Sequence, residues 1–135
     1  MRWSRAFGFI VAALPGAAFA GSLACAPDIV GRWTGRVLDG GRIKELRTEF
    51  STGSGQLTGR YHVEDVDGGY DGTLTDFTPL GPCAGEFLWH DRNGTGEVRV
   101  DFRPDRDRFD GLWGDDEPLP DHIFTGWRSR PVPVS

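Results

Sequence analysis

The sequence lacks a long hydrophobic run, and its apolar residues do not recur at the spacing of an amphipathic helix. The apolar run from Ala6 to Leu14 is shorter than the ~20 residues that a membrane-spanning helix needs. The 20 glycines among 135 residues further disfavour helices, because glycine is a poor helix former. These absences exclude a helical bundle and predict that the chain does not insert into a membrane.

Basic residues are scarce relative to acidic ones. The chain has 15 Lys and Arg against 20 Asp and Glu, a formal net charge of −5. Two of the bases, Arg2 and Arg5, lie in the first 20 residues, so the remainder carries 13 bases against 20 acids, or about −7. This balance argues against nucleic acid or an anionic membrane as a partner. It permits a cation or a basic protein segment.

Residues 1–20 have the order of a secretory signal peptide, with a basic start, a short apolar run and a small-residue end at Ala18-Phe-Ala20. We expect cleavage after Ala20 and a periplasmic or secreted product. The remaining chain is long enough for one domain but not for two. A lipoprotein cleavage site before Cys25 is the competing interpretation, although Ser22 stands where such a site carries an apolar residue.

Cysteine is nearly absent, since only Cys25 and Cys83 occur. Two cysteines in an exported chain predict one disulfide. Closing a loop of this length stabilises the folded state by about 4 kcal/mol in the chain-entropy model. The bond would tie an N-terminal segment, residues 21–30, across one end of the domain.

A short unit recurs through the rest of the chain, namely a large apolar residue, any residue, Gly, any residue and a second large apolar residue. Residues 109–113 (Phe-Asp-Gly-Leu-Trp) are its clearest copy. Alternate residues of a strand share one face, so rings of one strand can pack over glycines of the next. The pattern predicts an all-β, eight-stranded antiparallel up-and-down barrel over residues 31–128, followed by an extended tail, 129–135. The expected strands are 31–38, 42–50, 56–63, 70–77, 85–91, 95–103, 108–114 and 121–128.

Alternate loops of such a barrel lie at the same end. The end opposite the disulfide would hold loops rich in acids, with Arg92 as their single base. Those acids are Asp39, Glu64, Asp65, Asp67, Asp91, Asp115, Asp116, Glu117 and Asp121. The inward aromatic residues are expected to be Trp33, Tyr61, Phe87, Trp89, Phe102, Phe109, Trp113 and Trp127. We therefore predict a ligand site at this acidic mouth, formed by Trp89, Trp113, Asp65, Asp67, Asp115, Asp116 and Glu117. The alternative is that the rings only fill the core.

A calcium site is a further expectation for the same end. Asp65, Asp67 and Asp71 stand beside glycines, as carboxylates do in calcium loops. The segment lacks the bidentate Glu of an EF-hand, and the alternative is an acidic hairpin turn. No other cofactor is expected.

The first and last predicted strands carry Gly31-Arg-Trp33 and Gly126-Trp-Arg128. These motifs resemble the calycin superfamily, which comprises lipocalins, fatty-acid-binding proteins and avidins. The resemblance implies that Trp33 packs under Arg128, or under Arg130, and closes the base of a lipocalin-like barrel. Gly35 stands where an avidin has an Asn that binds biotin, so we do not expect biotin as the ligand.

Residues 87–113 also resemble MORN repeats, through a Phe-Leu-Trp segment followed by the Phe-Asp-Gly-Leu-Trp unit. That resemblance implies an open antiparallel sheet with an interaction role. The spacing upstream is irregular, which is unusual for repeat arrays. The closed barrel is therefore the favoured fold and the open sheet is its alternative.

The functional expectation is an exported binding protein whose acidic, aromatic-lined mouth takes a small or cationic ligand or a basic protein segment. The alternative is a structural or protein-interaction module with a solid core. An enzyme of unknown reaction is the third interpretation. It ranks last because the sequence offers no nucleophile–base pair. No pattern indicates an oligomeric state.

Overall fold

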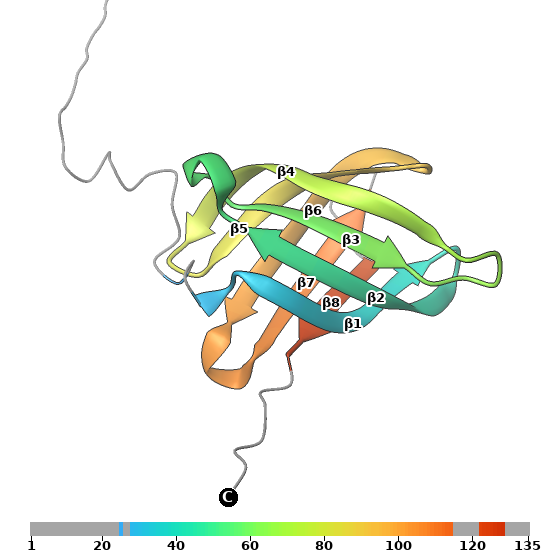
Figure 1. Cartoon of the computed structure of the whole chain (residues 1–135), viewed down its shortest axis with the longest axis horizontal. Helices are drawn as coiled ribbons and strands as arrows, with labels where there is room; N and C mark the ends of the chain where they lie inside the picture. Colours follow the sequence, from blue (N-terminus) through green and yellow to red (C-terminus); the bar gives the residue numbers. More distant parts are fainter. Residues whose placement is uncertain (1–24, 26–27, 115–121, 129–135) are drawn as a thin grey trace, which may run out of the picture.

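The chain folds into a closed barrel of eight antiparallel strands (Figure 1). A computed structural model describes residues 25, 28–114 and 122–128. The strands are β1 (Gly31–Asp39), β2 (Arg42–Ser51), β3 (Thr58–Val63), β4 (Tyr70–Gly81), β5 (Ala84–Asp91), β6 (Gly94–Arg103), β7 (Arg108–Gly114) and β8 (His122–Trp127), with short 3-10 turns η3 (Gly53–Gly55) and η4 (Pro104–Arg106). No helix in these residues is long and apolar enough to cross a membrane. The predicted signal peptide, residues 1–20, and the predicted tail, 129–135, lie outside the described residues.

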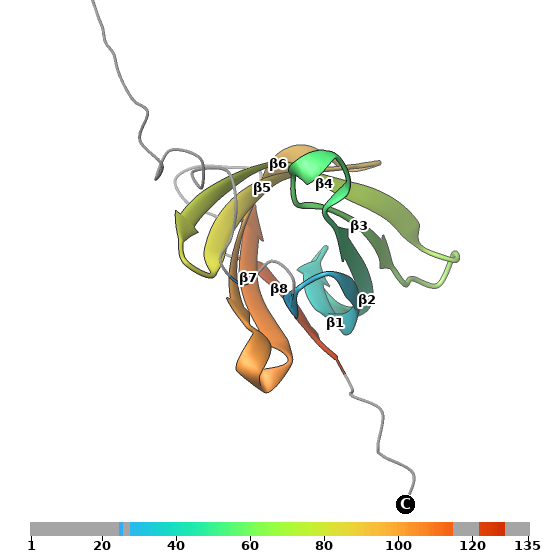
Figure 2. The same ribbon diagram turned by 60° about the vertical axis from the view of Figure 1, so that its left-hand side comes forward.

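The barrel closes where the first strand pairs with the last. Every other pairing joins strands that follow one another in the chain, whereas β1 and β8 pair from Thr34↔Trp127 to Val37↔Phe124. Gly35 faces Gly126 in this seam, and a Cβ atom on Gly35 would clash with the carbonyl group of Thr125. Figure 2 shows the strands arranged around a common interior. The predicted barrel is thus confirmed, and the open MORN-like sheet is not formed.

Aromatic rings fill the interior. Phe50 lies among Phe87, Phe102 and Phe109, with ring centroids 5.9, 5.3 and 5.5 Å away. The edge of the Phe109 ring occupies the space over Gly126. This is the arrangement that the repeated unit predicts, with the ring of one strand packed over the glycine of its neighbour.

The fourth strand is longer than expected. Residues 78–84 were predicted to form a loop, but β4 continues to Gly81. The register shifts between Thr75↔Leu88 and Thr78↔Glu86, so two residues of β4 oppose one residue of β5. This bulge places Asp76 at a φ of 55° and restores an inward direction for Phe77, whose ring lies 4.9 Å from that of Phe87.

The prediction that Trp127 points inward is wrong. Its neighbours Phe124 and Gly126 are buried, and alternation along β8 therefore directs Trp127 outward. The side chain is 41% exposed, and the Arg36 guanidinium lies 5.7 Å from its ring centroid. Trp127 thus belongs to the outer face rather than to the core.

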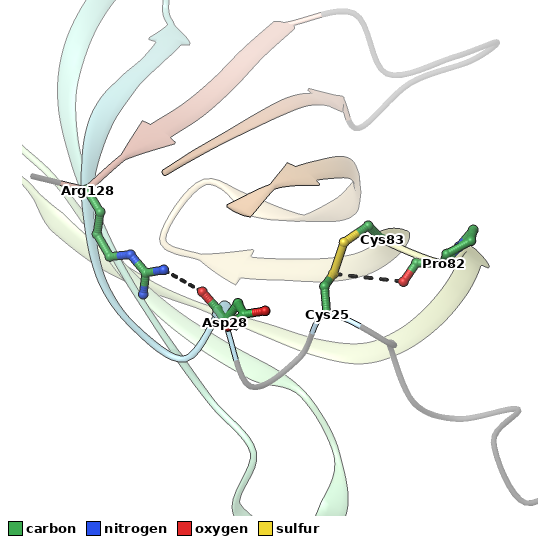
Figure 3. The surroundings of a disulfide bond; sticks show 5 residues. All are labelled: Cys25, Asp28, Pro82, Cys83 and Arg128. Atoms are coloured by element: carbon green, nitrogen blue, oxygen red, sulfur yellow. Dashed lines mark hydrogen bonds between the residues drawn. A yellow bond between two sulfur atoms is a disulfide. The ribbon is translucent and has the colours of Figure 1, made fainter. Parts of the chain in front are cut away.

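The predicted disulfide is confirmed. Cys25 and Cys83 are bonded, with their Cα atoms 5.7 Å apart (Figure 3). The bond holds the segment before β1 against the β4–β5 turn, and Ile29, which follows in the chain, is fully buried. Because lipidation at Cys25 would require the same sulfur atom, the disulfide contradicts the lipoprotein alternative.

Arg128 closes the same end of the barrel. Its guanidinium lies 4.2 Å from the ring centroid of Trp33 and donates hydrogen bonds to the carbonyl oxygens of Val30 (3.1 Å) and Asp28. The Trp33 ring nitrogen donates to the Ile29 carbonyl oxygen at 2.9 Å. The Arg128 guanidinium thus lies over the Trp33 ring at the end of the barrel that carries the disulfide.

Candidate functional site

The opposite end of the barrel, which we call the mouth, contains a small cavity between the β1–β2, β3–β4 and β5–β6 turns. Its volume is about 30 Å³. That is far below the ~300 Å³ of the smallest usual ligand pockets but enough for a water molecule or an ammonium group. The lining residues are Val37, Asp39, Tyr61, Val63, Tyr70, Trp89, Asp91, Asn93, Trp113 and Phe124.

Two tryptophans form part of the apolar wall of the mouth cavity. Trp89 and Trp113 pack edge to face, with ring centroids 5.3 Å apart. Trp89 donates from its ring nitrogen to the Gly114 carbonyl oxygen at 3.2 Å, and Trp113 donates to the Leu38 carbonyl oxygen at 2.9 Å. These hydrogen bonds fix both rings, so the cavity wall is already in place without a ligand.

Two carboxylates stand at the rim of the cavity because they are the last inward positions of their strands. Trp33 and Val37 are buried on β1, and the same alternation directs Asp39 inward; on β5 it directs Asp91 inward. Tyr70 donates its phenol to Asp39 Oδ2 and Tyr61 donates to Asp91 Oδ2, both at 2.6 Å. Asp91 Oδ1 also accepts the backbone N–H of Asn93 at 2.7 Å.

Basic side chains from β2 also reach the mouth. Lys44, the single lysine of the sequence, bonds Asp39 Oδ2 at 3.0 Å and Asp65 Oδ2 at 2.7 Å. Arg42 lies 3.3 Å from Asp65 Oδ1. The hydrogen bond from Lys44 lowers the pKa of Asp65, and the bonds to Asp65 and Asp39 raise the pKa of Lys44. The mouth is therefore less acidic than its loops alone suggest, because these two bases partly neutralise it.

Asp67 stabilises its own turn rather than the cavity. Its Oδ1 accepts the backbone N–H of Gly69 at 3.0 Å, a bond that lowers the pKa of Asp67. Its Oδ2 lies 3.4 Å from Arg92, whose guanidinium is 4.5 Å from the ring centroid of Tyr70. Neither Asp67 nor Asp65 lines the cavity, although both lie at the same end of the barrel.

The three carboxylates of the expected calcium site have separate partners. Asp71 points away from the other two, onto the outer face of β4, where it lies 2.7 Å from His62. Asp65 is held by Lys44, and Asp67 by its turn. The described part of the chain contains no group of three or more acidic, His or Cys residues that could hold a metal ion.

The mouth contains only part of the predicted ligand-binding set. Trp89 and Trp113 do meet at the cavity, and Asp65 and Asp67 lie outside it. The cavity carboxylates, Asp39 and Asp91, were predicted to be acidic residues of the mouth but not ligand contacts. The sequence could have identified both as cavity residues, since alternation along β1 and β5 directs their side chains inward. Asp115, Asp116 and Glu117 lie outside the described residues.

The two phenols of the mouth, Tyr61 and Tyr70, are the only tyrosines in the sequence. Burial first, and then hydrogen bonding to Asp91 or Asp39, raises the pKa of each above its usual range. A raised pKa contributes stability that is present below the unfolded-state value, about 10, and is lost as pH rises toward the folded-state value. The protonated phenols are hydrogen-bond donors and poor nucleophiles.

We predict that neither tyrosine of the folded protein ionises near pH 10, because each phenol is partly buried and donates to a carboxylate. In an alkaline titration, tyrosinate absorbance should appear only together with loss of the barrel, followed by far-ultraviolet circular dichroism. The urea-unfolded chain is the control and should titrate near the usual value of about 10. Tyrosinate that forms near pH 10 while the circular dichroism stays native would contradict the proposed hydrogen bonds.

Comparisons of the chain with protein-family models, with curated proteins and with solved structures found no match.

Proposed function

We propose that the protein is an exported binding protein whose mouth recognises an ammonium group, carried by a small amine or by a lysine of a basic protein segment. The observation that carries the proposal is the mouth cavity, where Asp39 and Asp91 stand at the rim of an aromatic wall. Carboxylates attract a cation, and aromatic faces add cation–π attraction. The calycin resemblance, with Arg128 over Trp33, supports the assignment to a ligand-binding type of barrel.

The small volume of the cavity restricts what can enter. About 30 Å³ admits an ammonium group but not a whole drug-sized molecule. The rest of the ligand would therefore remain outside, against the surrounding turns. This agrees with either a short alkylamine or the end of a lysine side chain.

The rim has unused capacity to accept hydrogen bonds. Asp39 receives both Lys44 and Tyr70 on Oδ2, and its Oδ1 accepts no hydrogen bond from the described residues. Each carboxylate oxygen can accept about two hydrogen bonds. An incoming ammonium group can thus donate to Asp39 Oδ1 and to Asp91 without breaking the bonds already present.

The proposal is tested by titrating the protein with propylammonium chloride and with N-acetyl-lysine amide. We expect saturable shifts of the indole N–H signals of Trp89 and Trp113 in NMR spectra, because both rings line the cavity. Asp39→Asn and Asp91→Asn should each weaken the affinity by at least about ten-fold, since each removes a charged acceptor.

Asp67→Asn is the matched control for these two variants. It removes the same charge at the same end of the barrel, but Asp67 does not line the cavity, and Asn keeps the oxygen that accepts from Gly69. We expect its affinity to stay within about two-fold of the unmodified protein. Equal weakening by Asp67→Asn, or equal binding of neutral propanol, would refute a specific ammonium site.

A second candidate function is that of an interaction module with a solid core, and the filled interior around Phe50 favours it. A module of this kind would bind partners on its outer face only. The amine titration separates the two candidates, because the second predicts that the signals of Trp89 and Trp113 do not move.

A further inference from the structure

A groove of about 610 Å³ lies on the outer face of the barrel, across strands β1 to β5. It lies on the other side of the sheet from the mouth cavity, since its charged lining side chains point outward and the two share only Tyr61. Its volume lies within the range of small-molecule sites, about 300–1,000 Å³. The groove is therefore large enough for a ligand that the interior cannot hold.

Main chain forms the floor of the groove. The floor residues, Trp33, Thr48, Tyr61 and Gly72, are paired in one row across β1, β2, β3 and β4. The three side chains in this row are nearly fully buried and point into the core. What these residues present to the outer face is their backbone, so the row leaves a trough between the side chains on either side of it.

The first wall of the groove is the neighbouring row of residues toward the disulfide end of the barrel. It contains Arg32, Glu49 and Arg60, which face one another on β1, β2 and β3. Arg32 lies 3.7 Å from Glu49 Oε2 and Arg60 lies 3.1 Å from Glu49 Oε1. Two guanidinium groups thus share one carboxylate, and this wall has an excess of positive charge.

The second wall is the row on the mouth side. Thr34, Arg47, His62 and Asp71 face one another across β1 to β4. His62 Nδ1 lies 2.7 Å from Asp71, and Arg47 lies 2.7 Å from Glu64, which is outside the groove lining. Residues two apart on a strand are about 7 Å apart, so guanidinium groups from both walls can reach one small ligand.

The guanidinium groups remain available to a ligand. The side chains of Arg32, Arg60 and Arg47 are 88%, 78% and 55% exposed. Exposed ion pairs of this kind are weak, and each guanidinium has five N–H donors. The lining holds three guanidinium groups against two carboxylates, in a chain whose net charge is −5. Glu64 beside the lining pairs with Arg47. The positive excess of the groove therefore lies at Arg32 and Arg60, which share the carboxylate of Glu49.

We propose that this groove binds a small molecule with at least two anionic groups, either carboxylates or phosphates. One anionic group would lie between Arg32 and Arg60, and the second would lie against Arg47 on the opposite wall. Guanidinium groups match both anions through paired hydrogen bonds. Thr34, on the second wall, adds a hydroxyl. This binding does not depend on the mouth site.

The test uses isothermal titration calorimetry with two probes, citrate for carboxylates and inorganic pyrophosphate for phosphates. We expect saturable one-to-one binding of at least one probe, and the tighter probe identifies the preferred anion. Arg60→Gln and Arg47→Gln should each weaken the affinity by at least about five-fold. Both positions are exposed, so the variants should retain the fold.

Arg99→Gln on β6 is the matched control. Arg99 is 50% exposed and pairs with Glu86 at 3.3 Å, as the groove arginines pair with their carboxylates, but it does not line the groove. Its loss should change the affinity by less than about two-fold. In NMR spectra the probes should leave the indole N–H signals of Trp89 and Trp113 in place. Equal weakening by Arg99→Gln, or failure of both probes to saturate, would overturn the proposal.

Discussion

Replacing Gly35 with alanine is expected to lower the free energy of unfolding by at least about 3 kcal/mol or to prevent folding altogether. A methyl group at this position would overlap the carbonyl carbon and oxygen of Thr125 on β8, and its third neighbour is the Cα atom of Gly126. These are backbone atoms and cannot rotate away as a side chain could. The β1–β8 seam would have to separate, and the barrel depends on that seam for closure.

Urea unfolding followed by circular dichroism measures this effect. Gly53→Ala is the matched control, because the added methyl group would meet no atom within 4 Å and the backbone there has no left-handed φ. It should change stability by no more than about 0.5 kcal/mol. A Gly35→Ala variant with native stability would show that the β1–β8 seam is not packed as described.

Removing the disulfide is expected to lower the free energy of unfolding by about 4 kcal/mol, which is the second large effect. Cys25 and Cys83 are 58 residues apart in the sequence, so the reduced chain gains considerable freedom when it unfolds. The bond also anchors the chain just before Ile29, which is fully buried. The double variant Cys25→Ala/Cys83→Ala should therefore unfold at a markedly lower urea concentration.

The reductant dithiothreitol provides the control for the disulfide prediction. It should lower the stability of the unmodified protein to nearly that of the double variant, and it should have no effect on the variant itself. Stability that is unchanged in both the variant and the reduced protein would contradict a structural role for the bond.

Alternation along the strands predicted most of the fold. The first strand was expected at 31–38 and is found at Gly31–Asp39, and the seventh was expected and found at 108–114. Closure was predictable because the pattern gives eight short, evenly spaced strands, enough for a sheet to close on itself. The bulge in β4 was not predictable, because a positive φ at Asp76 depends on the fit of Phe77 against Phe87 and not on local sequence.

The mouth shows where the sequence was insufficient. Its wall, Trp89 and Trp113, follows from strand parity, and so do Asp39 and Asp91 once parity is extended to the strand ends. The neutralising role of Lys44 was missed because the count of charges was confined to loops. Lys44 belongs to β2 and reaches two turns only through its long side chain, which is a three-dimensional property.

The outer groove depends on information of the same kind. Each of its walls combines residues from several strands, such as Arg32 and Arg60, whose relation is set by the registers of β1, β2 and β3. The sequence places these residues on the outer face but does not bring them together. The charge count over the whole chain, at −5, also conceals the two arginines that share the carboxylate of Glu49.

The position of the closing seam has a consequence for the order of assembly. All pairings except β1–β8 join neighbours in the chain and can form as successive hairpins. β8 is the last strand, so β1 keeps one unpaired edge until the whole domain is present. An unpaired edge can pair with another chain. Pairing between two chains, which rises with protein concentration, is therefore most favoured before the barrel closes. In the closed barrel β1 is paired with β8, which protects that edge from a second chain.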